Sequence, residues 1–355
     1  MSKKLKFAIV GCGRISKNHL EALASGNLSS ELVAVCDLIP EKAKEKSEKY
    51  KVPFYTDYNK MMESHPEIDV VNIATPTGMH ARHVIDISRH GKNIIVEKPM
   101  ALRVEDCDAM MKACADNKCR LFVVQQNRFN KAVQAARKAL DSGRFGKQVL
   151  GTVRVRWKRT QKYYEQDNWH GTWALDGGVM SQQASHHLDL LQWFMGPIDT
   201  MQCISATTLL DIEVEDTAVA TFRFKSGALG AFEATVASRP EDLEGSLNLL
   251  GENGSVILGG FAVNKIVYWK FENPLPEDEA TIKEFSVDVP NVYGLGHTPY
   301  LNNVIEAITQ NKPGLVEGSE GKKNIQILTA LYESAATGGT VVYPGYPVKV
   351  SKLGR

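Results

Sequence analysis

The feature that most constrains the fold is a glycine-rich turn that separates a strand pattern from a helix pattern near residue 11. Residues 6–10 form a short apolar run typical of a buried strand, and residues 17–24 have helical spacing. Gly11 and Gly13 match the first two glycines of the dinucleotide-binding fingerprint, and the small side chain of Ser16 fills the third position. The N–H groups at the start of such a helix attract a pyrophosphate. The pattern therefore predicts a dinucleotide site contacted by Gly11, Gly13, Arg14 and Ile15.

An acidic residue after the second strand pattern indicates which dinucleotide is bound. Residues 31–36 are β-rich, and Asp37 follows directly, 24 positions after Gly13 (37 − 13). A carboxylate there accepts hydrogen bonds from the adenosine ribose hydroxyls and repels a 2′-phosphate. No arginine follows at Leu38 or Ile39 to receive that phosphate. The pattern favours NAD over NADP, and the alternative is that Asp37 only caps the next helix.

Strand and helix patterns alternate along the first third of the chain. The later strand patterns are residues 69–73, 93–96 and 120–124, and the helix patterns are residues 41–50, 80–90 and 104–117. Such alternation favours parallel strands joined by right-handed crossovers. We therefore expect an α/β Rossmann domain over residues 1–125.

The pattern changes after Gln126. A helix pattern at residues 131–142 leads into an alternating strand, residues 153–158, whose basic side chains suit a solvated face. Further strand patterns follow at residues 201–205, 217–224, 228–236, 247–250, 254–258 and 265–269. Helix patterns at residues 300–310 and 322–337 end the chain, and Gly338 and Gly339 close the last. We expect residues 126–355 to form an α+β domain with a large, mostly antiparallel open sheet for substrate binding and subunit packing.

Charge and cysteine content exclude several classes of protein. The 42 Lys and Arg residues nearly balance the 41 Asp and Glu residues, so no strong field gathers nucleic acid or a membrane surface. The apolar run at residues 7–12 is too short for a signal segment, which leads us to expect a cytoplasmic protein. The six cysteines form no C-x-x-C pair, so we expect neither disulfides nor a metal site.

Five motifs, in order along essentially the whole chain, resemble the Gfo/Idh/MocA family of sugar and cyclitol oxidoreductases. They are AIVGCGRIS, IATPTGMHARHV, GKNIIVEKPMA, QQNRF and DGGVMSQQASHHLDLLQW. The resemblance implies that ATPTGMH lies against the cofactor and that EKP carries an active-site lysine, here Lys98. It also implies cofactor contacts by Ala74, Thr75, Pro76, His80, Glu97, Lys98 and Gln126.

Residues 156–193 resemble one subgroup of this family, the UDP-N-acetyl-2-amino-2-deoxyglucuronate dehydrogenases of bacterial surface-polysaccharide synthesis. The resemblance rests on a Tyr-Tyr pair and a Trp-x-Gly-Thr-Trp segment that precede a histidine-bearing helix. It implies oxidation of the sugar C3 hydroxyl to a ketone with NAD. The sequence departs from the subgroup at His170, where an arginine or lysine is expected.

Oxidation of a secondary alcohol requires a base for the hydroxyl proton, and Lys98 and His186 are the candidates. Pro99 restricts Lys98 to an extended conformation. Cyclitol-specific relatives have an aspartate four residues before the histidine, on the same helical face, but Gln182 stands there and cannot accept a proton. We assign the base to His186 and an electrostatic role to Lys98, with the reverse assignment still open. His187 is expected to be structural.

Several residues are candidates for substrate contact, although a solvated strand face and an aromatic core explain the same pattern. Basic and polar groups suited to a diphosphate are Arg156, Lys158, Arg159 and Gln161. Aromatic groups suited to stacking on uracil or a sugar are Tyr163, Tyr164, Trp169 and Trp173. The remaining candidates are Gln182, His186, His297 and Tyr300.

Two other functions remain open at this point. One is a dehydrogenase of a free sugar, a cyclitol or a dTDP-ketosugar. The other is an NAD-dependent glycosidase or a ligand sensor of the same family, although the presence of both Lys98 and His186 argues against a sensor. A 2-oxo acid is a possible co-substrate that reoxidises bound NADH. By resemblance we expect a homodimer or homotetramer.

Overall fold

The computed structural model describes residues 4–289, 294–345 and 352–355. The chain forms two compact units: unit 1 is Met1–Gln125 with His297–Lys322, and unit 2 is Gln126–Gly296 with Lys323–Arg355. Residues 297–322 therefore belong with the first unit, whereas the sequence led us to expect one continuous domain from residue 126 to the end. Helix α10 (His297–Thr309) packs against α1 (Ser16–Ala24). The Arg120 guanidinium also donates to the carbonyls of Ala307 and Lys312, at 2.5 and 2.8 Å.

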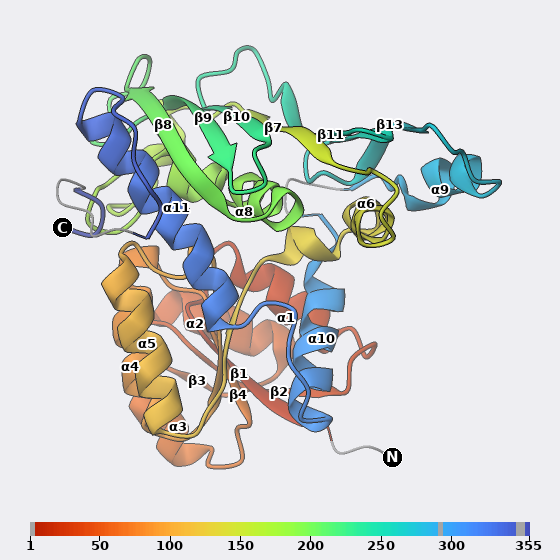
Figure 1. The fold of residues 1–355 in the computed structure, drawn as a ribbon. Helices are drawn as coiled ribbons and strands as arrows, with labels where there is room; N and C mark the ends of the chain where they lie inside the picture. Colours follow the sequence, from red (N-terminus) through yellow and green to blue (C-terminus); the bar gives the residue numbers. More distant parts are fainter. Residues whose placement is uncertain (1–3, 290–293, 346–351) are drawn as a thin grey trace. The chain divides into compact units, whose positions relative to one another are not determined.

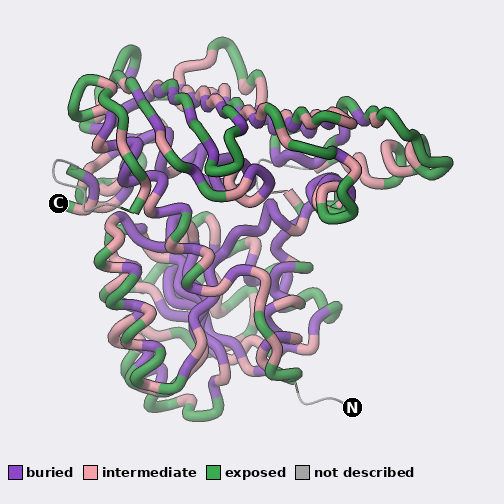
Figure 2. Tube along the Cα trace, in the orientation of Figure 1, coloured by how far each residue is buried: buried purple, intermediate pink, exposed green. Residues whose placement is uncertain are grey.

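Unit 1 contains a six-stranded parallel sheet in the order β3-β2-β1-β4-β5-β6, which is the dinucleotide-binding arrangement predicted from the sequence. Its strands are β1 Leu5–Val10, β2 Ser30–Cys36, β3 Phe54–Tyr55, β4 Val70–Ile73, β5 Asn93–Val96 and β6 Leu121–Val123. The central strands are buried along nearly their whole length (Figure 2) because their side chains are apolar on both faces.

Helices pack on both sides of this sheet: α4 and α5 lie on one side and α1 and α10 on the other (Figure 1). The remaining bounds are α2 Pro40–Tyr50, α3 Tyr58–Ser64, the 3-10 turn η1 Thr77–Met79, α4 His80–Ser88 and α5 Val104–Asp116. Helix α3 was not predicted, because its seven residues are too few to establish a helical period.

Unit 2 contains a seven-stranded sheet in the order β13-β12-β11-β7-β10-β9-β8. All neighbours are antiparallel except β7 and β10, which confirms the mostly antiparallel sheet. The strands are β7 Gln148–Arg156, β8 Ile198–Ala206, β9 Thr217–Phe224, β10 Leu229–Thr235, β11 Glu244–Gly251, β12 Gly254–Gly259 and β13 Lys265–Phe271. Along β7, Val153 and Val155 are buried and Arg154 is exposed, as the alternation predicts.

The helices of unit 2 support one part of this sheet, since α8 packs against β7 and β11. Their bounds are η2 Gln126–Phe129, α6 Lys131–Asp141, α7 Gln161–Tyr164, η3 Val179–Gln183, α8 Ser185–Met195, α9 Asp278–Phe285 and α11 Gly318–Ala336. Helix α11 begins in unit 1 and continues into unit 2. The short helices α7 and α9 were not predicted.

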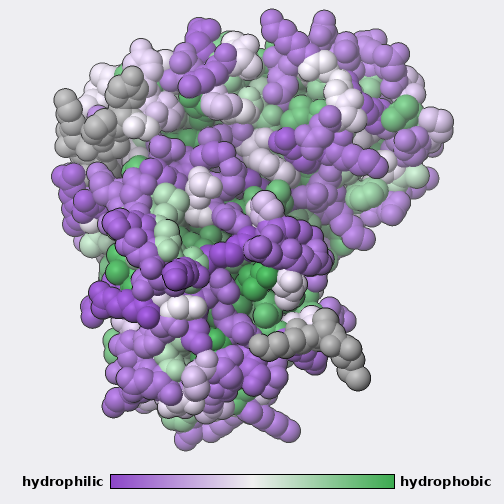
Figure 3. Space-filling model, turned by 60° about the horizontal axis from the view of Figure 1, so that its bottom comes forward, coloured by the Kyte–Doolittle hydropathy of each residue, from purple (hydrophilic) through white to green (hydrophobic). Residues whose placement is uncertain are grey.

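All six cysteines are buried and free. Within residues 4–289, 294–345 and 352–355, no helix combines the length and the apolar character needed to cross a membrane. The face drawn in Figure 3 is largely hydrophilic, with smaller groups of hydrophobic side chains between the polar ones.

Candidate functional site

The glycine-rich turn after β1 has the geometry that close backbone approach requires. Gly11 has φ = +98°, and a Cβ built there would lie 2.5 Å from the carbonyl oxygen of Ala74. A Cβ on Gly13 would meet no atom within 4 Å, so internal packing does not explain this glycine. Ser16 Oγ donates to the Gly13 carbonyl at 2.7 Å and ties the turn to α1. The turn thus fits a dinucleotide pyrophosphate. Of the other two candidate contacts, Arg14 is exposed and Ile15 is half-buried.

Asp37 is held at the mouth of this turn. Its Oδ2 accepts the Cys12 backbone N–H at 2.7 Å, and its Oδ1 accepts that of Ile39 at 2.8 Å. The second contact closes a turn before α2 and does not cap the helix, because Ile39 is the N-cap residue and no side chain caps α2. A carboxylate oxygen can accept more than one hydrogen bond, so these two contacts leave acceptor capacity for a ligand. The half-buried carboxylate therefore remains available for two ribose hydroxyls.

We predict that Asp37→Ala raises the KM for NAD about 10- to 100-fold, because hydrogen bonds to a charged acceptor contribute about 1.5–3 kcal/mol. The preference for NAD over NADP should narrow at the same time. Steady-state kinetics with both dinucleotides measure both effects. Glu41→Ala, in the exposed first turn of α2, is the matched control. An unchanged KM for NAD in Asp37→Ala would contradict the assignment.

His80 joins the turn after β4 to the turn after β5. Its Nδ1 lies 3.0 Å from the Pro99 carbonyl and its Nε2 lies 2.9 Å from the Thr75 carbonyl. Burial lowers the pKa of His80, although hydrogen bonds to the two carbonyls oppose the shift. Its neutral ring therefore donates to one carbonyl at a time. His80 connects the ATPT and EKP segments, and its burial points to positioning rather than to direct contact with a ligand.

The residues around the EKP motif differ in exposure. Lys98 and Thr75 are half-buried, as is Pro76. Ala74 and Glu97 are buried, at 7% and 5% exposure. The Lys98–Pro99 peptide bond is cis. Lys98 thus stands at the carboxyl end of a parallel strand, which is the edge where ligands bind in open α/β sheets.

Glu97 lies in a buried polar cluster that sequence reasoning did not find. His19 Nε2 lies 2.7 Å from Glu97 Oε1, and Asn72 Nδ2 lies 3.1 Å from His19 Nδ1. His297, a predicted substrate contact, is also here: its Nε2 lies 4.0 Å from Glu97 Oε1, and its ring packs edge-on to His19 at 5.2 Å. It is 5% exposed and belongs to unit 1, so the structure places it in the interior of that unit. Tyr300 is likewise buried, at 1%.

The second catalytic candidate, His186, is at the start of α8 and is 6% exposed. The Gln126 side-chain amide lies 3.3 Å from its Nε2. One turn further along α8, Asp189 forms a bidentate ion pair with Arg128 at 2.7 and 2.8 Å, and both are buried. The QNRF segment thus orients the histidine helix through two residues, and Gln126 contacts His186 within unit 2.

The expectation that Gln182 and His186 share one face of a single helix is wrong. Gln182 lies in the π-helical turn η3, which ends at Gln183, and α8 begins at Ser185. The Gln182 side chain donates to Asp176. The turn η3 starts at Val179 because Glu215 accepts hydrogen bonds from its first two N–H groups. The Glu215 backbone oxygen accepts the Val179 N–H at 3.0 Å, and Glu215 Oε1 accepts the Met180 N–H at 3.0 Å.

Glu215 is a buried carboxyl group that titrates near neutrality. Its Oε1 also accepts the Tyr332 hydroxyl at 2.9 Å, whereas Oε2 has no hydrogen-bond partner among the described residues. Burial raises the pKa of Glu215 to about 7, and the nearby Asp176 adds to the shift. A carboxyl pKa that is raised by folding makes the native state less stable as pH rises from about 4.5 to about 7.

We therefore predict that Glu215→Gln stabilises the protein at pH 8 by up to about 3 kcal/mol, which corresponds to the raised pKa. The glutamine side chain keeps an oxygen that can accept the Met180 backbone N–H and the Tyr332 hydroxyl. At pH 4.5 the advantage should vanish, because the wild-type carboxyl is then protonated in the native state. Thermal unfolding of both proteins between pH 4.5 and 8 measures the difference. A difference that does not change with pH would contradict the expected titration.

The four aromatic substrate candidates lie on the segment that follows β7, and the structure brings three of them together. The Tyr163 ring lies 5.0 Å from Tyr164 and 5.0 Å from His170, and His170 stacks on Trp169 at 3.7 Å. Trp173 instead packs on Tyr332 at 5.6 Å. Tyr164 is 5% exposed and belongs to the core, whereas the other three rings of the cluster are half-buried and remain accessible for stacking.

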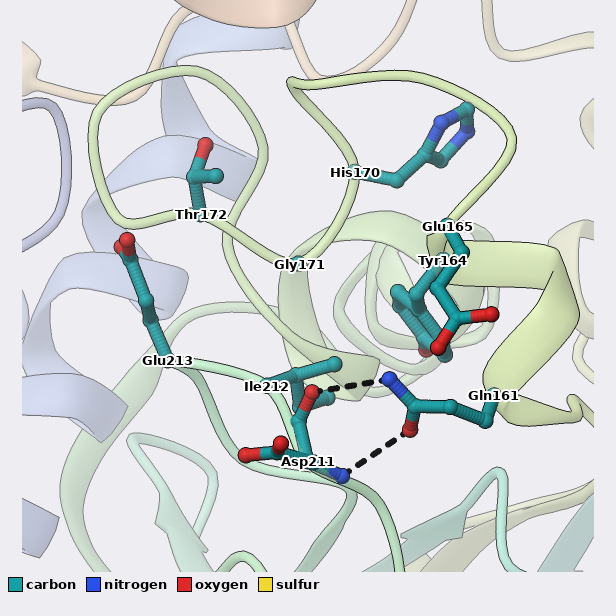
Figure 4. A pocket seen from close by; sticks show the side chains of 9 residues that line it. All are labelled: Gln161, Tyr164, Glu165, His170, Gly171, Thr172, Asp211, Ile212 and Glu213. Atoms are coloured by element: carbon teal, nitrogen blue, oxygen red, sulfur yellow. Dashed lines mark hydrogen bonds between the residues drawn. The ribbon is translucent and has the colours of Figure 1, made fainter.

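A cavity of about 490 Å³ opens beside this aromatic cluster (Figure 4). The Gln161 side chain spans one wall, where it accepts the Asp211 N–H and donates to the Asp211 carbonyl, both at 3.0 Å. Three carboxylates line the cavity, from Glu165, Asp211 and Glu213. Carboxylates accept hydrogen bonds from hydroxyl groups and repel phosphate, so the cavity suits a polyol and not a diphosphate.

The basic residues on β7 and just after it differ in whether an acidic side chain already forms an ion pair with them. Arg156 forms a bidentate ion pair with Glu233 at 2.6 and 2.8 Å and lies 3.4 Å from Glu244. The ion pair with Glu233 raises the pKa of Arg156. Its expected role at a diphosphate is therefore not supported, and the strand-face alternative describes its environment. Lys158 lies beyond the end of β7 and is half-buried.

Comparison with known proteins agrees with this geometry. The NAD-binding Rossmann model of the GFO_IDH_MocA oxidoreductase family matches residues 5–125, and its C-terminal alpha/beta model matches residues 137–342. An inositol 2-dehydrogenase of Rhizobium meliloti is 31% identical over 214 residues, which is 60% of this chain and 61% of that protein.

Two solved structures are similar over nearly the full length. A WlbA dehydrogenase from Bordetella pertussis, in complex with NADH and UDP-GlcNAcA, is 40% identical, covers 98% of this chain and 99% of its own, and has a TM-score of 0.91. The Chromobacterium violaceum WlbA complex with the same two ligands is 39% identical, covers 98% of each chain, and has a TM-score of 0.90. The chain therefore belongs to the Gfo/Idh/MocA family of oxidoreductases and has that family's NAD-binding Rossmann domain.

Proposed function

We propose that the protein oxidises the C3 hydroxyl of UDP-N-acetylglucosaminuronic acid to a ketone with NAD, as a step of bacterial polysaccharide synthesis. The observation that carries this proposal is the full-length similarity, at 40% and 39% identity, to two dehydrogenases whose complexes contain NADH and UDP-GlcNAcA. Gln182 supports the same choice. Cyclitol-specific relatives have a proton-accepting aspartate at this position, and a glutamine side chain cannot accept a proton.

The proposed chemistry divides between a base and an electrostatic partner. NAD, when bound, takes the hydride from the substrate carbon. His186 accepts the hydroxyl proton, and the Gln126 amide at its Nε2 helps to hold the buried ring in place. Lys98 stabilises the negative charge that develops on the oxygen as the proton leaves. The half-buried position of Lys98 at the end of β5 supports this role.

The substrate segments are proposed from their chemistry in unit 2. Tyr163 and Trp169 offer ring faces to the uracil or the sugar, and Lys158 offers positive charge to the diphosphate. Arg159 is a weaker candidate for the diphosphate, because it already lies 3.4 Å from the Asp242 carboxylate. Arg159 lies 5.5 Å from the Tyr163 ring, so charge and aromatic surface are adjacent. The acidic cavity beside them suits hydroxyl groups.

Other parts of the proposal concern the setting of the reaction. We propose that the protein works in the cytoplasm as a homodimer or homotetramer, and that a 2-oxo acid reoxidises NADH in place. Size-exclusion chromatography with light scattering measures the oligomer. Mixing NADH-loaded protein with 2-oxoglutarate and following reduced-nicotinamide absorbance tests the recycling step.

A substrate panel tests the proposed activity. Reduction of NAD is followed with UDP-N-acetylglucosaminuronic acid, UDP-N-acetylglucosamine, myo-inositol and glucose at equal concentration, with enzyme and substrate equimolar so that retained NADH is still seen. We expect the uronic acid to react fastest. A faster reaction with inositol or glucose would reject the nucleotide-sugar assignment, and release of an aglycone from a glycoside would identify a glycosidase.

A further inference from the structure

A series of buried hydrogen bonds ends at the backbone of Lys98. Asn72 Nδ2 lies 3.1 Å from His19 Nδ1, and His19 Nε2 lies 2.7 Å from Glu97 Oε1. Glu97 Oε2 in turn accepts the Lys98 backbone N–H at 3.1 Å. Asn72, His19 and Glu97 are 1%, 1% and 5% exposed. The series connects β4 and α1 with the residue that follows β5, all within unit 1.

The hydrogen bonds run in one direction. The Asn72 amide nitrogen can only donate, so it donates to Nδ1, and Nε2 presents the ring proton to Glu97. Burial by itself would raise the pKa of Glu97, but chiefly its hydrogen bond to His19 holds that pKa below its ordinary value. Glu97 is therefore an anion at neutral pH, and an anionic acceptor strengthens its bond to the Lys98 N–H.

We propose that Asn72, His19 and Glu97 form a positioning relay that fixes the Lys98 backbone and thereby the place of its ammonium group. The proposal rests on the role given to Lys98 above. It assigns functions to His19 and Asn72, and it gives Glu97 a supporting role in place of the expected cofactor contact. A reacting group that is held by buried, hydrogen-bonded residues stays close to the position that catalysis requires.

His297 borders this relay without being a link in it. Its Nε2 is buried, and in the part of the chain that the structure describes it has no hydrogen-bond partner. Burial lowers the pKa of His297 to about 3, so its ring is neutral. One ligand-type atom from each of His19, Glu97 and His297 lies within 4.8 Å of the others, which is also compatible with a bound cation. The positioning relay and a metal centre make opposite predictions for His297.

The kinetic test compares two replacements of His19. His19→Phe keeps the ring shape but donates nothing to Glu97, and we expect kcat to fall about 30-fold, since a misplacement of about 1 Å costs up to about 10²-fold. The KM values for NAD and substrate should stay within about threefold, because the binding groups are unchanged. His19→Gln retains an N–H donor near Nε2 and should recover most of kcat. His65→Phe, at a half-buried histidine of the same unit that pairs with Glu67, is the matched control.

The pH profile separates a positioning role from a general loss of stability. Without the His19 donor, burial should raise the pKa of Glu97, so that kcat of His19→Phe rises with pH over a range where wild type is flat. Charged or titratable groups that face Glu97 are His19, Lys98, His80, His297 and Tyr300. Equal losses at every pH, or no recovery in His19→Gln, would overturn the proposal.

A second readout does not depend on the reaction. In protein labelled with ¹⁵N-lysine, the Lys98 amide proton, assigned with Lys98→Arg, should resonate downfield because it binds a carboxylate. The signal should move upfield in His19→Phe and Glu97→Gln and stay in place in His297→Phe and His65→Phe. If the substrate panel fails but these shifts occur, the relay stands and only the substrate is wrong. Tightly bound zinc in the purified protein, lost in His297→Phe, would instead reveal a metal centre.

Discussion

Lys98→Met is expected to lower kcat about 10²- to 10³-fold while NAD still binds. The side chain is nearly isosteric but carries no charge, so it removes the electrostatic stabilisation of the developing alkoxide, a contribution of about 10²–10³ when one such donor is lost. Placement at the carboxyl end of β5, directly after buried Glu97, supports the choice of this residue. Rapid mixing of enzyme, NAD and UDP-N-acetylglucosaminuronic acid measures the hydride step itself.

The control is Lys60→Met, which changes an exposed lysine on α3 and should keep the wild-type rate. NAD affinity, measured by protein fluorescence, should change less than about tenfold in Lys98→Met, because the residues proposed to contact the pyrophosphate and the ribose lie elsewhere in unit 1. A Lys98→Met protein that retains a tenth of the wild-type rate would remove Lys98 from the chemistry.

His186→Asn is expected to lower kcat about 10²- to 10⁴-fold, the usual contribution of a general base. Added imidazole should restore part of the rate, because it can take the place of the missing base. His186 is buried in unit 2 and its Nε2 faces the Gln126 amide, so the asparagine also breaks that contact. Rescue by imidazole separates loss of the base from loss of packing.

His187→Phe is the matched comparison. Both ring nitrogens of His187 lack hydrogen-bond partners among the described residues, and its ring packs edge-on against Trp157 at 5.9 Å. Burial lowers the pKa of His187 to about 4, so its ring is neutral and phenylalanine is a close substitute. The rate should therefore stay within a few-fold of wild type. A larger loss in His187→Phe than in His186→Asn would reverse the assignment.

Local patterns predicted those parts of the fold that depend on neighbouring residues. The turn at Gly11 and the carboxylate of Asp37 lie next to strands whose apolar runs are unmistakable, and alternation alone predicted a parallel sheet with five of its six strands. The sixth strand, β3, has only two residues and was not predicted. Helix α10 shows the limit: its helical period was clear, but its position against α1 depends on contacts across more than 270 residues, such as His297 with His19 (297 − 19 = 278). No periodicity contains that information.

The candidate site likewise contains residues that motifs predict and residues that only the structure reveals. Lys98 and His186 were found from motifs, and their roles remain predictions. The structure was needed to find that Arg156 is paired with Glu233, because the partner is fixed by the parallel register of β7 and β10. It was also needed for His19 and Asn72, whose side chains meet across 53 residues. A buried histidine inside a helix gives no signal in the sequence beyond its polarity.

The most direct test of the central claim is the fate of the hydrogen at C3 of the sugar. UDP-N-acetylglucosaminuronic acid carrying deuterium only at C3 is mixed with equimolar enzyme and NAD, and the nicotinamide and sugar products are analysed by mass spectrometry. We expect one deuterium in the reduced nicotinamide and a 3-keto sugar without it. Reduced nicotinamide that lacks deuterium, or a sugar that keeps its C3 deuterium, would contradict oxidation at C3.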